Sequence, residues 1–567
     1  MDKKLTVADF FCGAGGFSEG FRQAGFEITF ALDNWNIARQ THKLNHPNCK
    51  HPGLDCHFET GGNILQIPVE RINEIVDDVD VIIGSPPCVS FSSSNKAGNA
   101  DKSLGLELIE KYLQIIAIKK YKKNSKLKYW LMENVPNSRN HVKKEYTFGM
   151  LGLNNNILKS LKINKKENQI AIKLDNSEDN VYDSVHFGVA QKRKRFVCGE
   201  FPKPKKTTPK EKDWITLGMV INSLKSNNKK INDPIYQFSI NQKDLTDHYY
   251  NTTIHHFEWE EAKIKKQQAR YYGKMSFPEN EDKPSRTVMA TRSVVSRESM
   301  VLPNDSPGGY RSPTIREVAS IMSFPITYLF QANNEASKYR LVGNAVCPKL
   351  AYNFAKSILE KENKVVKNPE INVLGNTKLI VDLRKNNPSE KILRDKHPRS
   401  NFIEIVPDLK YKNFRVELDN NSPKNTKNRI MWSASLHHAT GKNSMKFCKA
   451  NIGEIESLLF PSKYKKEIKG YIKEIKKQFR GKIPDSEKFQ KQHHQFNPSK
   501  KYFTPRKSLR LIKDILDKHF PEEKYESISL INNGQLKFDR GSIPNDSVPL
   551  RILCAYYSLI LLVNNIK

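Results

Sequence analysis

Cysteine is scarce in this chain of 567 residues, with eight copies and no Cys-x-x-Cys pair. A secreted scaffold held by disulfides would carry a denser set, so the composition favours a reducing compartment. The N-terminal segment lacks the long apolar stretch of a signal peptide. The longest apolar run, residues 552–563, is too short to span a bilayer. We therefore predict no membrane association and a buried helix at this run.

Acidic residues are a minority, with 61 Asp and Glu against 94 Lys and Arg, a net charge of +33. Such an excess favours a polyanionic partner, although a generally lysine-rich surface is the alternative. The excess is uneven, because residues 361–567 hold 42 basic and 22 acidic residues. This shift predicts a domain boundary near residues 360–370.

Short apolar runs alternate with helical patterns in the first 135 residues, which predicts βαβ units and a mostly parallel sheet. The predicted strands are LTVADFF, EITFALD, DVDVIIGSPP and KLKYWLMENV. In such sheets, ligands bind beyond the carboxyl ends of the strands. A glycine cluster, Asp33, Cys88 and Glu133 all lie at these ends, so we group them into one site.

The first of these strand ends, DFFCGAGGFSEG, combines a tight glycine turn with the start of a helix. Glycine lets the backbone turn and approach a ligand closely, and the first N–H groups of a helix are free to bind one. Asp33, at the end of the next strand, could accept hydrogen bonds from ribose hydroxyls. Any α/β protein can carry a similar turn, so this segment alone does not decide for a cofactor.

GSPPCVSFS places Cys88 behind two prolines at a strand end, where a thiolate could act as a nucleophile. A cysteine that merely packs in the core is the alternative. MENVPN places the carboxylate of Glu133 at another strand end. QKRKR carries Arg193 and Arg195 at alternate positions, which predicts two guanidinium groups on one face of an extended segment. A basic edge strand would look the same.

Together these segments resemble the cytosine-C5 methyltransferase family. DFFCGAGGFSEGF is similar to its first motif, GSPPCVSFS to its catalytic motif, MENVP to its Glu-Asn-Val motif and QKRKR to its Gln-x-Arg-x-Arg motif. SPTIREVASIMSFP and LVGNAVCP resemble its last two motifs. All six stand in the family's order over about residues 5–360. The long insert before SPTIREVA lies where the family keeps its target-recognition region.

The resemblance implies a role for each matching residue. Cys88 would attack C6 of cytosine, and Glu133 would hold N3 and the exocyclic amine. Arg193 and Arg195 would support the base, Glu133 and the catalytic loop. The base would first leave the duplex, and Cys88 would be released after methylation at C5. S-adenosyl-L-methionine would be the methyl donor, bound by Phe11, Gly13, Gly15, Gly16, Phe17, Asp33, Pro86 and Asn344.

The match has two departures. The family often has Gly-Asp-Ile where this chain has Gly62-Asn63-Ile64, which would exchange a carboxylate for an amide near the adenine. The segment after the catalytic motif, SSNKAGNADKSLGLE, matches the family's arginine-bearing motif only loosely. Neither departure involves the nucleophile.

Two groups of residues are not explained by the family. One segment is crowded with potential metal ligands, but their spacing matches no familiar zinc finger, so we predict no metal site. These ligands are His42, His46, Cys49, His51, Cys56 and His57. Within the insert, EDKPSRTVMATR resembles an element of target-recognition regions. His255, His256, Tyr271 and Tyr272 could contact DNA or simply pack.

Residues 365–567 have no counterpart in a minimal methyltransferase, and three interpretations stay open. Their charge favours an accessory DNA-binding domain. A fused restriction nuclease could use Asp408, Glu417 and Asp419 to bind Mg²⁺, although the lysine expected after the last acid is missing. The amphipathic segment KKEIKGYIKEIKKQF also suits a structural or partner-binding domain.

We therefore predict a doubly wound α/β fold with a small target-recognition domain and an extra basic C-terminal α+β domain. The predicted boundaries are 1–200 for the catalytic domain, 201–310 for target recognition, 311–364 for the return to the catalytic domain and 365–567 for the extension. The predicted function is methylation of cytosine at C5 in a specific duplex DNA sequence, within a restriction-modification system that includes a cognate endonuclease. A tRNA cytosine methyltransferase, a bifunctional enzyme with a fused C-terminal domain and a catalytically inactive DNA-binding protein are the alternatives. The expected location is cytoplasmic, and nucleoid-associated in a prokaryote.

Overall fold

The structure is a computed structural model, and the residues it describes run from 3 to 566 with gaps. They are 3–54, 61–87, 103–225, 229–267, 275–304, 309–366, 368–372, 380–383, 403–404, 409–411, 413–420, 430–438, 445–447, 451–494, 499–521, 527–529 and 547–566. The chain divides into two compact units. Unit 1 holds residues 1–252, 265–302 and 312–387, and unit 2 holds residues 253–264, 303–311 and 388–567.

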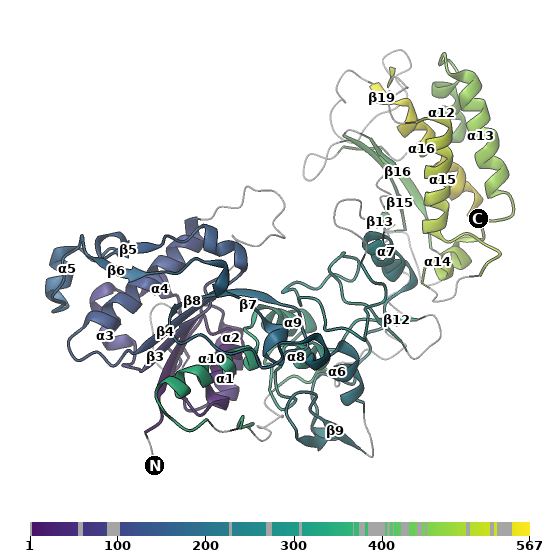
Figure 1. Ribbon diagram of the computed structural model, residues 1–567. Coiled ribbons are helices and arrows are strands. Elements are labelled where there is room, and N and C mark those ends of the chain that lie inside the picture. Colours follow the sequence, from purple (N-terminus) through teal and green to yellow (C-terminus); the bar gives the residue numbers. More distant parts are fainter. Residues whose placement is uncertain are drawn as a thin grey trace. The chain divides into compact units, whose positions relative to one another are not determined.

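A six-stranded sheet in the order β2-β1-β3-β4-β8-β7 forms the centre of unit 1 (Figure 1). The first four of these strands run parallel, and β8 and β7 are added antiparallel. The strands are β1 (Thr6–Phe10), β2 (Glu27–Leu32), β3 (Val81–Gly84), β4 (Tyr129–Asn134), β7 (Val181–Asp183) and β8 (Lys194–Glu200). This mixed, mostly parallel sheet confirms the predicted Rossmann-like, doubly wound fold.

Helices cover both faces of this sheet, because successive strand residues point to opposite sides. Val7 and Val81 belong to the core on one face, and Ala8 and Ile82 to the core on the other. The first core also contains residues of α1 (Gly16–Gln23), α8 (Ile315–Ile321), α9 (Glu335–Asn344) and α10 (Pro348–Lys361). The second contains residues of α3 (Ile72–Ile75) and α4 (Ser103–Tyr121). Residues after the insert thus return to pack beside the first helix.

Smaller elements complete unit 1. Helix α2 follows β2, and β5 pairs with β6 outside the main sheet. The insert before α8 is largely irregular, with α6 and the β9–β10 pair in this unit. Their bounds are α2 (Asn36–Asn45), β5 (Glu145–Thr147), α5 (Asn155–Ser160), β6 (Ile170–Lys173), α6 (Leu217–Ser223), β9 (Lys230–Asn232) and β10 (Ser239–Asn241).

Unit 2 has its own core, between an antiparallel sheet and a group of helices. The sheet contains β13 (Ile403–Glu404), β14 (Lys410–Tyr411), β15 (Phe414–Asp419), β16 (Ser433–His438) and β17 (Met445–Phe447). The helices are α12 (Ile452–Leu459), α13 (Lys465–Phe479), α14 (Ser486–His494), α15 (Pro505–His519) and α16 (Leu550–Asn565), and β18 (Ser527–Ser529) pairs with β19 (Ser547–Pro549). The longest apolar run forms the buried helix α16, as predicted. Among the described residues, no helix has the length and apolarity needed to cross a membrane.

Two segments of the insert belong to unit 2. Helix α7 (His256–Gln267) begins there, and its Glu260 and Glu261 pair with Arg510 (2.8 Å) and Arg506 (3.1 Å) of α15. The ring of Trp259 lies 4.8 Å from that of Tyr310, in the second segment. Residues 253–264 and 303–311 therefore share a compact unit with the C-terminal extension.

Glycine at position 20 allows α1 and α10 to pack closely. A Cβ atom at Gly20 would lie 2.6 Å from the backbone nitrogen of Tyr352 and would also meet Ala351 and Pro348. We expect Gly20→Ala to lower the free energy of unfolding by about 1–3 kcal/mol, because the helices must separate. Urea unfolding measures this. Adding Ala351→Gly should restore part of the loss, and an unchanged stability of Gly20→Ala would contradict the close packing.

Candidate active site

The glycine turn after β1 forms the first part of the candidate site. Gly13 (φ 53°) and Gly15 (φ 88°) adopt left-handed backbone conformations that favour glycine. At Gly15, a Cβ would lie 2.5 Å from the Tyr328 hydroxyl oxygen, so a side chain is also excluded sterically. Gly16 then starts α1, whose first N–H groups lie next to the turn. The turn therefore presents backbone donors at the carboxyl end of the sheet.

Asp33 holds this turn against the end of β2. Its Oδ2 accepts a hydrogen bond from the N–H of Gly13 (2.9 Å), and its Oδ1 accepts one from Trp35 (2.7 Å). Burial raises the pKa of this carboxyl, while the two backbone donors and Arg39 counteract the rise. Among the described residues, the space beside Gly13 is open, because the nearest atom to a Cβ there would be the Phe11 carbonyl oxygen at 4.0 Å. A ligand could approach both the turn and the carboxylate.

Glu133 lies at the end of β4, buried to 4% exposure, with partners on both carboxylate oxygens. Ser85 Oγ, just after β3, donates to Oε2 (2.5 Å), and Arg195 Nε on β8 pairs with Oε1 (2.9 Å). Three neighbouring strands therefore fix the orientation of this carboxylate. One terminal nitrogen of the Arg195 guanidinium and the remaining lone pairs of the Glu133 carboxylate could still form hydrogen bonds with a substrate.

Arg193 has a different environment from Arg195. Its guanidinium donates to three backbone carbonyls, those of Val288 (3.0 Å), Gly343 (3.0 Å) and Ala345 (3.2 Å). Arg193 directly precedes β8, and its side chain is buried at 3% exposure. In this structure Arg193 joins the insert to the end of α9, whereas Arg195 contacts Glu133.

Five cysteines lie in the part of the chain that the structure describes, and all are buried thiols. Burial raises the pKa of each, which disfavours the reactive thiolate. They are Cys12, Cys49, Cys198, Cys347 and Cys554. Cys88 lies outside the described residues, directly after Pro87 at the end of the β3 segment. Its predicted role as nucleophile remains a prediction.

The other predicted cofactor residues are spread around the glycine turn. Phe11 is half-buried, with its ring 6.5 Å from that of Tyr112. Phe17 is buried and packs on Phe21 (5.8 Å between rings). The carbonyl of Pro86 accepts a hydrogen bond from Asn134, and Asn344 is exposed as the last residue of α9.

Comparison with known proteins agrees with this geometry. The family model for C-5 cytosine-specific DNA methylases matches residues 5–360. The chain belongs to the C-5 cytosine-specific DNA methylase family. It is 28% identical over 373 residues to the type II methyltransferase M.MthTI of Methanothermobacter thermautotrophicus, covering 62% of this chain and 97% of that protein. It is 27% identical over 379 residues to M.NgoPII of Neisseria gonorrhoeae, covering 62% and 95%.

Among solved structures, the methyltransferase EhMeth of Entamoeba histolytica aligns with a TM-score of 0.41 and 15% identity, over 64% of this chain and 99% of that one. The family match ends at residue 360, so the extension lies beyond it.

As a C-5 cytosine-specific DNA methylase, the protein is a DNA (cytosine-5-)-methyltransferase with S-adenosyl-L-methionine as methyl donor. The described residues fit this donor, because the open space at Gly13 lies beside the half-buried carboxylate of Asp33. The turn would offer backbone N–H groups, and Asp33 could accept hydrogen bonds from hydroxyl groups.

Two residues without a predicted role support the candidate active site. Ser85 binds Glu133, and Asn134 Nδ2 donates to the carbonyl of Pro86 (3.1 Å), which links the ends of β3 and β4. Both stand inside the quoted motifs, next to Pro86 and Glu133. Their position was therefore visible in the sequence, but their partners depend on the pairing of two distant strands.

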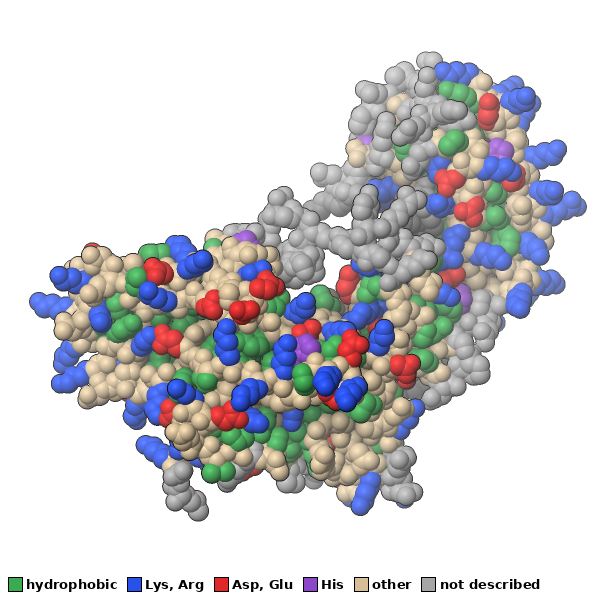
Figure 2. All heavy atoms as spheres, in the orientation of Figure 1, with side chains coloured by type: hydrophobic (Ala, Val, Ile, Leu, Met, Phe, Trp, Pro, Cys, Tyr) green, Lys and Arg blue, Asp and Glu red, His purple; other side chains and the backbone are tan. Residues whose placement is uncertain are grey.

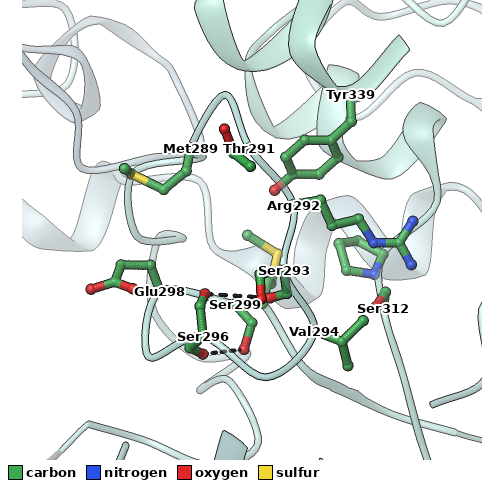
Figure 3. A pocket seen from close by; sticks show the side chains of 12 residues that line it. Met289, Thr291, Arg292, Ser293, Val294, Ser296, Glu298, Ser299, Ser312 and Tyr339 are labelled. Atoms are coloured by element: carbon green, nitrogen blue, oxygen red, sulfur yellow. Dashed lines mark hydrogen bonds between the residues drawn. The ribbon is translucent and has the colours of Figure 1, made fainter. Parts of the chain in front are cut away.

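A separate hollow is lined mainly by residues of the insert, together with Ser312 and Pro313 of the SPTIREVA segment and Tyr339 of α9 (Figure 3). Thr291, Arg292, Ser293 and Tyr339 are among its lining residues, and it opens to solvent. Arg292 pairs with Glu335, which also accepts a hydrogen bond from Tyr250 (2.7 Å). Of the predicted catalytic residues that the structure describes, Glu133, Arg193 and Arg195, none lines this hollow, so we do not place the chemistry there.

The histidine-rich segment forms a buried cluster behind the glycine turn. Ligand atoms of His42, Cys49 and His51 lie within 4.8 Å of one another, a separation that could hold a metal ion. However, His42 Nδ1 is hydrogen-bonded to His51 Nε2 (2.8 Å) and its Nε2 to Ser18 Oγ (2.9 Å). The imidazoles thus have protein partners, and Cys56 and His57 lie outside the described residues.

In the extension, the three acids considered for a nuclease are only partly described, because Asp408 lies outside the described residues. Both oxygens of Glu417 have cationic or imidazole partners, Arg415 (2.7 Å) and His437 (3.0 Å). Burial alone would raise the pKa of Glu417, but these hydrogen bonds outweigh it and lower the pKa to about 2. Lys446 Nζ lies 3.9 Å from Asp419 Oδ2. The nuclease stays an alternative.

The different contacts of the two arginines predict different defects. Arg195→Gln removes the positive charge but keeps a side-chain donor for Glu133, so it should lower the rate of methyl transfer about 100-fold and destabilise the fold less than Arg193→Gln does. Arg193→Gln leaves buried carbonyls without their donor and should lower the free energy of unfolding by about 1–3 kcal/mol. Single-turnover kinetics and urea unfolding separate the two. Equal kinetic and stability profiles for both variants would contradict this division.

Asp9, on β1 beneath the glycine turn, predicts a pH dependence. Burial raises its pKa to about 8, against a hydrogen bond from Ser18 that lowers it. Between about pH 4 and pH 8 the folded protein keeps a proton that the unfolded chain releases, so stability falls as the pH rises. The loss should approach about 1.4 kcal/mol per pH unit and disappear in Asp9→Asn. Urea unfolding at pH 5 and pH 8 tests this, and parallel pH profiles for both proteins would refute it.

Proposed function

We propose that this protein methylates C5 of a cytosine in a specific duplex DNA sequence through a covalent bond between Cys88 and C6 of the base. The target cytosine leaves the duplex first, because its C6 is inaccessible within the stack. The observation that carries the proposal is the fixed carboxylate of Glu133, which Ser85 and Arg195 hold at the carboxyl end of the parallel strands. Cys88 follows Ser85 by three residues in the sequence.

In the proposed reaction, bonds and protons change in three steps at Cys88 and the cytosine base. The Cys88 thiol gives up its proton and its sulfur adds to C6, while N3 gains a proton and Glu133 accepts hydrogen bonds from N3–H and the exocyclic amine, which produces an enamine. S-adenosyl-L-methionine supplies the methyl group that C5 takes. A base removes the C5 proton, the C6–S bond breaks, and the proton on N3 returns to the sulfur of Cys88.

We further propose a modification role in a restriction-modification system, with a cognate endonuclease acting on the same site. The support is the similarity to type II methyltransferases, two of which match over nearly their whole length. Methylation of tRNA is the second candidate from the sequence, and no contact in the described residues favours it.

Transfer of a tritiated methyl group to duplex DNA and to tRNA tests the substrate. We expect transfer to DNA by the wild-type full-length protein, and a loss of at least about 10³-fold in Cys88→Ala, because the covalent route needs the thiolate. A duplex containing 5-fluorocytosine should trap a denaturation-resistant protein–DNA adduct, since fluorine at C5 cannot leave as a proton does.

Cys347→Ala is the matched control, because that thiol is buried with a raised pKa and should not react. It should retain both methyl transfer and adduct formation. Transfer by Cys88→Ala at the wild-type rate would refute the covalent role, and transfer to tRNA alone would refute the DNA substrate.

A further inference from the structure

Helix α13 carries an uninterrupted row of lysines on its exposed side. At 100° per residue, six lysines fall within an arc of about 120°. These residues, called the α13 stripe below, are Lys465, Lys466, Lys469, Lys473, Lys476 and Lys477, and all are exposed. The apolar residues of the helix, such as Ile468 and Ile475, face the core of unit 2 instead. Figure 2 shows basic side chains along the edge of this unit where Figure 1 places α13.

The α13 stripe differs from other lysines in the same unit. On α14 and α15, Lys488, Lys491 and Lys513 each pair with an acid three or four residues away, and Lys518 pairs with Glu474. In the described part of the chain, only Lys476 of the stripe has an ion pair, with Glu456 at 3.6 Å. The two acids of α13, Glu467 and Glu474, lie outside the arc. An ordinary solvated helix face would interleave both charges.

Such a stripe destabilises the isolated helix. Lys465, Lys469, Lys473 and Lys477 follow one another at i, i+4 spacing, at which like charges repel. A polyanion laid along the helix would remove this repulsion. Helix α13 is about 22 Å long, a length over which duplex DNA presents about 13 phosphates.

We propose that the α13 stripe is a phosphate-backbone contact for duplex DNA, outside the methylase site. It contributes affinity without reading bases, because flexible lysines bind phosphates as point charges. The occupant follows from charge complementarity, together with the net excess of 20 positive charges in residues 361–567. The choice of DNA rests on the proposed function. Residues 253–264 and 303–311 of the insert share this unit, so the contact belongs to the same compact body as part of the insert.

The test uses full-length protein and a mixed-sequence duplex, with the affinity measured at several salt concentrations. The stripe variant carries Lys469→Gln, Lys473→Gln, Lys476→Gln and Lys477→Gln. Each lost phosphate contact reduces the slope of log K against log salt by about 0.9. We expect the magnitude of this slope to decrease by about 2–3 and the affinity near 0.15 M salt to weaken at least about 10-fold.

The matched control removes the same charge from the same unit at paired lysines, by Lys488→Gln, Lys491→Gln, Lys513→Gln and Lys518→Gln. Its slope should change by less than about 1. Thermal unfolding of the stripe variant should occur at or above the wild-type temperature, because repulsion is removed. Equal slopes in the stripe and control variants would overturn the proposal, as would a stripe effect seen with duplex RNA but not with DNA.

Methyl transfer to the same duplex separates this proposal from the proposed function. Loss of salt dependence in the stripe variant without any wild-type methyl transfer would refute the function and keep the contact. Methyl transfer with unchanged salt dependence would keep the function and refute the contact.

Discussion

The ion pair between Arg195 and Glu133 is the interaction on which the candidate active site depends. It joins β8 to β4 at the point where the parallel part of the sheet meets its antiparallel part, and Ser85 extends the link to β3. A buried carboxylate without such partners would carry a large desolvation cost. The contacts on both carboxylate oxygens therefore keep Glu133 in a defined orientation at the carboxyl end of β4.

Arg193 connects three backbone segments near this ion pair. Its three carbonyl acceptors lie in the insert and at the end of α9, so one side chain joins segments that are 95 and 150 residues away in sequence. A guanidinium suits this task because its donors diverge in one plane and it keeps its charge when buried. The methylase motif thus uses one arginine for the carboxylate and one for the architecture around it.

The strand-end positions of Asp33 and Glu133 could be predicted because parallel strands bring their carboxyl ends together, and the structure has β2 and β4 in that arrangement. The turn at Gly13 and Gly15 was equally visible, since only glycine accepts those backbone angles without strain. The different partners of Arg193 and Arg195 were not predictable, because those partners come from segments that are distant in sequence. Whether Phe17 can reach a ligand from the core around Phe21 is likewise a question of packing, which local sequence does not encode.

In the extension, too, local patterns predict the helices but not the contacts between distant segments. Its helices α13 and α16 follow from apolar periodicity and from a long apolar run. The partnership of Glu260 with Arg510 does not, because no local pattern links residues 250 positions apart. The domain boundaries proposed from composition remain a prediction, while the contacts divide the chain after residues 252, 264, 302, 311 and 387.

These divisions have a consequence for synthesis of the chain. The glutamates of α7 leave the ribosome well before their arginine partners on α15, which follow about 250 residues later. At roughly 5–20 residues per second, that delay lasts on the order of 10–50 seconds. During this time the N-terminal sheet can already close, while residues 253–264 and 303–311 wait for the extension. Completion of unit 2 is therefore a late event in the synthesis of this protein. A ribosome that stops near residue 400 would release a chain in which unit 1 can fold, while the insert segments of unit 2 lack the extension they pack with.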